Sequence, residues 1–454
     1  MTRALAEFKP TRDDWVGLYT CGPTVYDYAH LGNLRTYIFE DWLKRILKYN
    51  GYQVRQVMNI TDVGHLTDDA DDGEDKLEIG ARREGKTAGQ IADFYTAAFK
   101  NDLAALNISQ PDIWCRATDH IPEQIALARI LEQKGYTYRA SDGLYFDTFK
   151  LTDYNKLSHL PLADLQAGAR VKVNPEKKHP TDFAVWKFSP PDSQRQMEWP
   201  SPWGVGFPGW HLECSAMSLR YLSGHLDIHC GGIDHINVHH TNEIAQSEAA
   251  TGQPFFHYWL HGAFLNIAGG KKMAKSADNF LTLDKALTQR DLPPLVFRYA
   301  CAQTHYRKPM EYGPDIMANA ANGYAHLRNQ VARLGTDAGL APQNWQTEFL
   351  SALNDDLNLP AALAVLSGVL KSDLPLADQK ALILKFDQVL GLDLTDSQIL
   401  PAALPLAAAE LFQARQRARA VGDWATADKQ RAELLKLGFV LEDGPDGTII
   451  RPAK

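Results

Sequence analysis

The chain has 454 residues, of which 45% are hydrophobic and 22% are charged, and its formal net charge is −8. This length suggests several domains, and the acidic balance excludes a protein that binds nucleic acid through its overall charge. No apolar run reaches the roughly 20 residues of a membrane-spanning helix, the N-terminus lacks the apolar core of a signal peptide, and the five cysteines are scattered. We therefore expect a cytoplasmic protein with reduced thiols.

The beginning of the chain carries the pattern of a parallel nucleotide-binding sheet. Residues 16–20 (VGLYT) predict a short buried strand, and apolar side chains from about Leu34 repeat at helical spacing until Asn50 and Gly51 end the helix. Residues 53–61 then alternate as a second strand. Strand, turn, helix and strand in this order form half of a Rossmann-type sheet.

The turn before this helix contains His30, Gly32 and Asn33 in the sequence HLGN. Free backbone N–H groups and the helix dipole favour phosphate at such a position. Simple helix capping also explains a histidine and a glycine in a turn, so the motif alone leaves both interpretations open.

The pattern changes in the middle of the chain. Residues 67–75 are acidic, but an EF-hand loop there would place Ala70 and Ile79 where oxygen ligands are required, so we expect a solvated loop. Residues 84–107 predict an amphipathic helix. From residue 109 to about 202, short strands, turns and a basic segment with prolines indicate an insertion between two halves of the sheet.

The second half of the sheet resumes near Gly206 and leads to the most informative side chains. Cys214 lies here, and His239 precedes Glu243 by four residues, a spacing that puts both on one helix face. Thiolate, imidazole and carboxylate are zinc ligands, and zinc usually takes four. Three ligands come from this stretch and a fourth must come from elsewhere. Buried cysteines and helix-surface histidines are also common without a metal.

A glycine-rich basic loop follows at residues 269–276 (GGKKMAKS). Its lysines can place ammonium groups on a polyphosphate, although the spacing does not match a P-loop. A solvated surface loop is the alternative interpretation.

The sequence beyond about residue 315 has an almost entirely helical pattern. The spacing predicts helices over 316–335, 345–355, 360–371, 378–391 and 404–420. The tail predicts one more helix and then a small hairpin with an Asp446-Gly447 turn.

Four segments together resemble the cysteinyl-tRNA synthetases, a family of class I aminoacyl-tRNA synthetases. They are CGPTVYDYAHLGN, GWHLECSAM, VHHTNE and KMAKS, and they follow in this order over about residues 15–310. The resemblance implies an α/β fold with a Rossmann-type, doubly wound parallel-sheet catalytic domain. Its two halves would span 1–108 and 205–315 around a connective insertion at 109–204. An α-helical bundle domain (316–400) and a C-terminal anticodon-binding module (401–454) would follow.

The resemblance also implies one zinc ion per chain. It supplies Cys21 as the fourth ligand beside Cys214, His239 and Glu243. Zinc binds a thiolate well and a serine hydroxyl poorly, so such a metal would select a substrate thiol.

The other site residues follow from the same resemblance. ATP binding is implied for five residues: Thr24, His30, Asn33, Lys272 and Lys275. The last four are also expected to act in catalysis, with Mg²⁺ accompanying the ATP. Contacts to the amino acid are expected from Thr61, Trp210 and Asp234. The implied reaction is ATP-dependent ligation of L-cysteine to tRNA(Cys) through a cysteinyl-adenylate, in a monomer without membrane contact.

The sequence departs from the family pattern in two places. HLGN replaces His-Ile-Gly-His, so Asn33 stands where the second histidine is expected, and Ala274 in KMAKS removes a hydroxyl from KMSKS. Cys230 and His235 lie close to the proposed ligands, and we expect them to pack or to contact solvent.

Two other functions stay open. A zinc-dependent cysteine ligase that acts on an amino-sugar, as in mycothiol synthesis, resembles the catalytic half. Against it stands the C-terminal region, whose basic and aromatic residues favour anticodon binding: Arg415, Arg417, Arg419, Trp424, Lys429 and Arg431. We expect phosphate contacts from Arg415, Arg419 and Lys429, although a basic helix can also be a solvated face. A non-catalytic tRNA- or zinc-binding paralogue should have lost His30, Lys275 or a zinc ligand, and none is lost.

Overall fold

A computed structural model describes residues 4–65, 75–160, 174–190, 194–267, 271–272, 280–394, 406–444 and 447–452. The contacts divide the chain into two units, residues 1–318 with 352–360 and residues 319–351 with 361–454.

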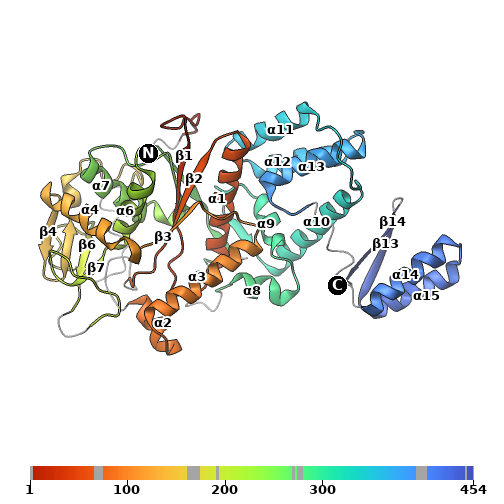
Figure 1. Ribbon diagram of the computed structural model, residues 1–454, viewed down its shortest axis with the longest axis horizontal. Helices are drawn as coiled ribbons and strands as arrows, with labels where there is room; N and C mark the ends of the chain where they lie inside the picture. Colours follow the sequence, from red (N-terminus) through yellow and green to blue (C-terminus); the bar gives the residue numbers. More distant parts are fainter. Residues whose placement is uncertain are drawn as a thin grey trace. The chain divides into compact units, whose positions relative to one another are not determined.

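Strand β1 (Val16–Thr20) is buried along its whole length, which places it inside a sheet. It pairs in parallel with β2 (Val54–Ile60) on one side and with β8 (Ile228–Gly232) on the other. β3 (Ile113–Arg116) and β9 (Tyr258–Gly262) complete the parallel order β3-β2-β1-β8-β9, and Figure 1 labels β1, β2 and β3 of this sheet. The order reverses between β1 and β8, so ligands are expected at the carboxyl ends of these two strands. The predicted fold class is confirmed.

Helices cover both faces of this sheet. On one face, α6 (Trp210–Leu222) and α7 (His239–Thr251) share a buried apolar core with Tyr19 and Val57 of the sheet. On the other, α1 (Leu31–Tyr49) contacts β2, β8 and β9 (Figure 1). The strand predicted at residues 16–20 is thus confirmed, while α1 begins three residues before the predicted start at Leu34.

The region before the insertion holds two helices instead of one. α2 (Lys76–Glu84) ends at Gly85, whose φ of 63° is left-handed, and α3 (Ala88–Ala105) starts after a capping box formed by Thr87 and Gln90. The single helix predicted over 84–107 is therefore wrong in its first turn. Most of the acidic stretch 67–75 lies outside the described residues.

The insertion between the sheet halves contains α4 (Ile121–Gln133) and an antiparallel sheet of order β4-β5-β6-β7. These strands are β4 (Thr137–Ala140), β5 (Gly143–Phe146), β6 (Phe183–Phe188) and β7 (Gly206–Pro208). β3 lies beyond the boundary expected at residue 108 and still pairs with β2. β7 lies beyond 204 and still pairs with β6. The domain boundaries expected at residues 108 and 204 stay predictions.

Smaller elements complete the first unit. A three-stranded sheet of order β11-β10-β12 follows β9, and α8 and α9 lie between β11 and β12 in the sequence. The bounds are β10 (Leu265–Ile267), β11 (Lys271–Lys272), α8 (Leu283–Ala286), α9 (Leu295–Ala302) and β12 (Met310–Tyr312). Short 3₁₀ helices span Thr118–His120, Thr148–Lys150, Ile233–His235 and Thr288–Arg290.

Helices predominate after β12, as the sequence predicted. They are α10 (Pro314–Ala332), α11 (Gln343–Asn354), α12 (Leu359–Leu370), α13 (Leu376–Leu390), α14 (Leu406–Ala420) and α15 (Trp424–Lys436). In the described part of the chain, no helix is long and apolar enough to cross a membrane.

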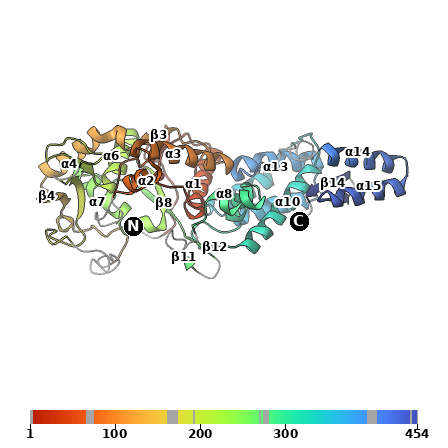
Figure 2. The same cartoon turned by 90° about the horizontal axis from the view of Figure 1, so that it is seen from below.

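The C-terminal module packs α14 and α15 side by side and ends in an antiparallel hairpin, β13 (Phe439–Gly444) with β14 (Gly447–Pro452) (Figure 2). The predicted hairpin is confirmed, although Asp446 of its turn lies outside the described residues. Arg415 of α14 is 3% exposed and donates to Asp443 at 2.6 Å and to Thr448 at 3.1 Å. Arg419 also pairs with Asp443. Both arginines that were expected to contact tRNA phosphates therefore form ion pairs within the module, and Arg415 is not exposed at its surface.

Candidate active site

The loop after β1 brings Cys21 to the carboxyl end of the sheet. Its backbone N–H donates to the Cys230 carbonyl of β8 at 3.2 Å, and the next N–H, of Gly22, donates to Asn59 Oδ1 at 2.8 Å. A Cβ on Gly22 would lie 1.6 Å from the Asn59 carbonyl oxygen, so only glycine allows this close approach to β2. Cys21 is thereby fixed between the two halves of the sheet.

Four buried side chains meet at this end of the sheet: Cys21, Cys214, His239 and Glu243. Their donor atoms all lie within 4.8 Å of one another. His239 and Glu243 face each other along the first turn of α7, with Nε2 and Oε1 3.0 Å apart. Glu243 Oε1 is fully buried, and its near neighbour is this ring nitrogen of His239. A buried carboxylate oxygen needs a partner, and at this position either a proton on His239 or a bound cation can serve.

The electrostatics of the four groups suit a cation as well. Burial raises the pKa of the Cys21 thiol well above its usual range, and that thiol's hydrogen bond lowers the pKa of Cys214. Burial also raises the pKa of Glu243, but His229 and His239 outweigh it and bring this pKa to about 2. Burial lowers the pKa of His239, yet Glu243 and Cys214 raise it to about 10. Glu243 is therefore anionic at neutral pH, and the proton of His239 balances its charge.

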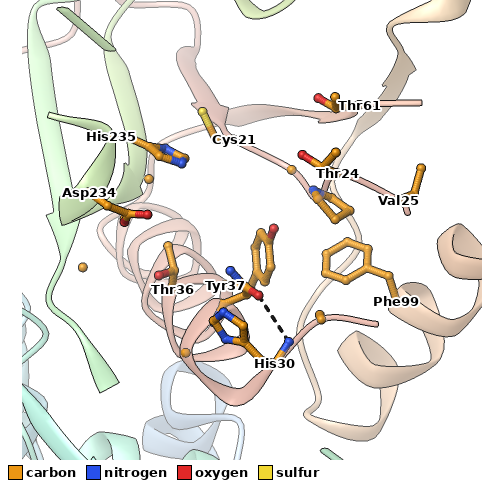
Figure 3. A pocket seen from close by; sticks show the side chains of 18 of the residues that line it. Cys21, Thr24, Val25, His30, Thr36, Tyr37, Thr61, Phe99, Asp234 and His235 are labelled. Atoms are coloured by element: carbon orange, nitrogen blue, oxygen red, sulfur yellow. Dashed lines mark hydrogen bonds between the residues drawn. The ribbon is translucent and has the colours of Figure 1, made fainter. Parts of the chain in front are cut away.

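A cavity of about 440 Å³ opens beside these donors, and Figure 3 shows Cys21 at its wall. Its lining includes three of the four donor residues, all but Glu243. Six more of the residues predicted for the site line this cavity: Thr24, His30, Asn33, Thr61, Trp210 and Asp234. In Figure 3, Cys21 and Asp234 lie toward one side of the cavity and His30 at its lower edge.

The HLGN turn is capped by its own residues. His30 is the N-cap of α1: its Nδ1 accepts the Asn33 N–H at 3.1 Å, and Asn33 Oδ1 accepts the His30 N–H at 3.2 Å. The Leu31 N–H donates to the Leu281 carbonyl at 2.9 Å. Backbone groups expected to hold phosphate thus have partners in the protein. Because Nδ1 of His30 accepts, the proton of a neutral ring lies on Nε2, which can donate.

The described flanks of the KMAKS loop lie beside this turn. Phe280 packs edge-on against the His30 ring, with centroids 5.5 Å apart. Buried Arg35 of α1 donates to the carbonyls of Ala263 and Phe264 at 2.8 and 2.7 Å, just before β10. β10 pairs with β11, which contains Lys272; Lys275 and Ala274 lie outside the described residues. Arg35 thus links α1, which begins in the HLGN turn, to the start of β10, the strand that leads to the KMAKS loop.

Thr61 belongs to a buried chain of hydrogen bonds. Its hydroxyl accepts from Asn59 Nδ2 at 3.0 Å and donates to Glu213 Oε2 at 3.1 Å. Glu213 Oε1 also contacts His65 Nε2 at 2.5 Å. The chain ties the ends of β1 and β2 to the residue before Cys214, so Thr61 positions the donor residues in addition to lining the cavity.

The comparisons with known proteins agree with this arrangement. Residues 7–322 match the family model of the tRNA synthetases class I (C) catalytic domain, and residues 402–451 match the cysteinyl-tRNA ligase anticodon binding domain. Cysteine–tRNA ligase 1 of Burkholderia lata is 51% identical over 98% of this chain and 94% of its own length. The cysteine–tRNA ligase of Treponema denticola is 41% identical over 96% and 95%.

The chain belongs to the cysteine–tRNA ligase family. Among solved structures, a methionyl-tRNA synthetase of Mycobacterium tuberculosis bound to methionyl-adenylate aligns with a TM-score of 0.56 at 15% identity, covering 83% of this chain and 90% of that one. LeuRS of Agrobacterium radiobacter, in a ternary complex, aligns with a TM-score of 0.60 at 12% identity, covering 85% and 84%. At such low identity these two structures show the shared class I fold alone.

Reasoning from the sequence missed several residues of this ligase site. Tyr37 and Phe99 line the cavity, and His211, His229, His240 and His261 surround the donors. One signal was present: eight of the 15 histidines fall between residues 211 and 261. Cys230 is fully buried, as expected. His235 lines the cavity, and burial together with His239 lowers its pKa to about 4.

Proposed function

We infer that the chain ligates L-cysteine to tRNA(Cys) with ATP, through a cysteinyl-adenylate, and that a zinc ion selects the substrate thiol. The observation that carries this inference is the convergence of Cys21, Cys214, His239 and Glu243 below a cavity that also presents His30. Two sulfur donors, one imidazole and one carboxylate match the preferences of zinc.

The four donor residues would hold zinc at the floor of the cavity. When bound, the metal supplies a Lewis acid that accepts a thiolate sulfur and discriminates against hydroxyl or methyl groups. An apolar pocket separates substrates by only about 1–3 kcal/mol per methylene, so sulfur recognition removes the need for an editing site.

The remaining groups of the amino acid would meet the rim of the cavity. Asp234 is exposed there, and its carboxylate is suited to the substrate ammonium group. Trp210 starts α6 with its ring centroid 4.4 Å from that of His239, so its indole limits the space beside the thiol. The cysteine carboxylate is then free to attack the α-phosphorus of ATP.

Phosphate groups would lie on the side of the HLGN turn. His30 Nε2 donates to a phosphate oxygen, while Thr24 lines the same cavity. Lys272 and Lys275 would neutralise the departing pyrophosphate, with Mg²⁺ bound to the ATP. Phosphoryl transfer needs positioning and charge more than covalent help, which these side chains can provide.

Pyrophosphate exchange with each amino acid in turn tests this function. We expect exchange with cysteine, almost none with serine at equal concentration, and about one zinc per purified chain. The variant Cys214→Ala should lose zinc and exchange together. Full zinc retention in this variant would contradict the ligand assignment. Attachment of cysteine to an amino-sugar, with no charging of tRNA, would instead favour the small-molecule ligase.

A further inference from the structure

A second set of four donors lies behind the first. Cys21, His229, His240 and Glu243 place their donor atoms within 4.8 Å of one another, and all four side chains are buried. We call these residues the inner set, and Cys21, Cys214, His239 and Glu243 the outer set. The two sets share Cys21 and Glu243, and the inner set exchanges a thiol and an imidazole for two imidazoles.

The spacing of the inner set is that of a coordination shell. Cys21 Sγ lies 3.4 Å from His240 Nε2, and His229 Nε2 lies 2.9 Å from Glu243 Oε2. The other donor pairs of the inner set lie within 4.8 Å. Donors of a tetrahedral zinc ion are about 3.3–3.6 Å apart, so shifts of up to about an ångström would seat a metal here.

Glu243 is oriented to serve two positions at once. Its Oε1 faces His239 of the outer set at 3.0 Å, and its Oε2 faces His229 of the inner set at 2.9 Å. A carboxylate that presents one oxygen to each side can bridge two cations, as in two-metal sites whose ions lie about 3.5–4 Å apart.

One tautomer of His229 leaves room for a cation. Its Nε2 lies 2.9 Å from Glu243 Oε2 and its Nδ1 lies 3.3 Å from the Cys230 carbonyl oxygen, and both of these oxygens only accept, so a neutral ring donates to one of them. When the ring donates to the Cys230 carbonyl, the lone pair of Nε2 faces Glu243, and a cation between them would take the place of a proton. His240 Nδ1 lies 2.8 Å from His261 Nε2, the kind of outer contact that orients a metal-ligating imidazole.

The inner position is separated from the substrate. Among the described residues, those that line the cavity include Cys21 but not His229, His240 or Glu243. A cation on the inner set would therefore touch no substrate atom directly. It would act through Cys21, whose sulfur it would share with the outer ion.

We propose that the inner set binds a second soft divalent cation, zinc or cadmium, bridged to the outer position by the Cys21 sulfur and the Glu243 carboxylate. The site rests on the outer zinc of the proposed function, because two donors are common to both. Two thiolates and one carboxylate carry three negative charges. With one dication bound, one negative charge remains on the cluster. With two dications bound, one positive charge remains. The inner ion has no anionic donor of its own, so it binds more weakly than the outer ion and fills only at raised metal concentration.

Zinc titration of the full-length, metal-stripped chain tests the site, with bound metal measured by elemental analysis after equilibrium dialysis. We expect the wild-type chain to take up two ions, one tightly and one more weakly. His240→Gln and, as a second variant, His229→Gln should each lose the weak ion alone. His257→Gln is the matched control, because His257 is exposed, and it should keep both ions.

Each outcome of the titration decides the proposal. One ion at saturation in the wild-type chain would overturn it, and this result does not depend on how any variant folds. Two ions in both inner variants would also overturn it. Cys214→Ala reports on the outer set separately: loss of only the tight ion supports both sites. Retention of both ions in Cys214→Ala would contradict the outer assignment instead.

Discussion

At the scale of single residues, the capping box of α1 accounts for a motif that lacks its second histidine. Asn33 uses its carbonyl oxygen on the His30 N–H, and its own N–H goes to His30 Nδ1. Gly32 makes this possible, because a Cβ there would lie 2.9 Å from Cε1 of the His30 ring. Asn33 therefore supports the cap, and in the proposed function the contact with phosphate falls to His30.

This division of roles predicts unequal effects of two substitutions. His30→Ala removes the Nε2 donor and should lower the kcat of pyrophosphate exchange about 100-fold, a typical loss for one positioned donor. Asn33→Ala keeps the backbone N–H that orients the His30 ring and should cost about 10-fold or less. Steady-state exchange rates of the two variants check this. Equal losses would mean that Asn33 contacts the nucleotide itself.

At the scale of elements, Arg415 joins α14 to the terminal hairpin. Arg415→Ala would leave Asp443 without its strongest partner and remove a buried side chain, so it should destabilise the module by about 2–3 kcal/mol. Arg417→Ala is the matched control two residues further along the same helix, where the side chain is exposed. Hydrogen exchange of the α14 and α15 amides measures local stability. Equal protection in both variants would contradict a structural role for Arg415.

The same ion pair predicts how the module responds to acid. Hydrogen bonding by Arg415 lowers the pKa of Asp443 to about 2, below its unfolded value of about 3.9. A carboxylate with a depressed folded pKa stabilises the fold above the unfolded pKa and loses this contribution as pH falls through the folded pKa. Protection of the hairpin amides should therefore decline between about pH 4 and pH 2, and this decline should be absent in Asp443→Asn.

The periodicity of apolar residues predicted most helices and strands. It failed for features that depend on contacts between residues far apart in the sequence. β1 and the helices from α10 to α15 were found from their own side chains. β3 was placed in the insertion, because the four residues of this strand show no pattern that indicates its pairing with β2. For the same reason His229 and His240 could not be placed beside Cys21, which lies about two hundred residues earlier. Cys21 itself came from the family resemblance and from no spacing rule.

At the scale of the whole molecule, the net charge of −8 means that tRNA must be held by local groups. With Arg415 buried and Arg419 paired to Asp443, the exposed Arg417 and Lys429 are better placed for phosphate contacts than two of the three residues first expected. Both belong to the region that matches the anticodon binding domain. In the proposed function, cysteine activation takes place in the other unit and needs neither side chain.

The double variant Arg417→Gln/Lys429→Gln should separate these two steps. Each lost phosphate contact removes about one released counterion, so the slope of log KM for tRNA against log salt should fall by about 2. KM should rise most at low salt, while cysteine-dependent pyrophosphate exchange in the same preparation stays at the wild-type rate and shows that the catalytic unit is folded. Aminoacylation assays between about 50 and 200 mM salt measure the slope. An unchanged slope with normal charging would show that the tRNA is held elsewhere, and a parallel loss of exchange would show that the substitutions act through stability instead of binding.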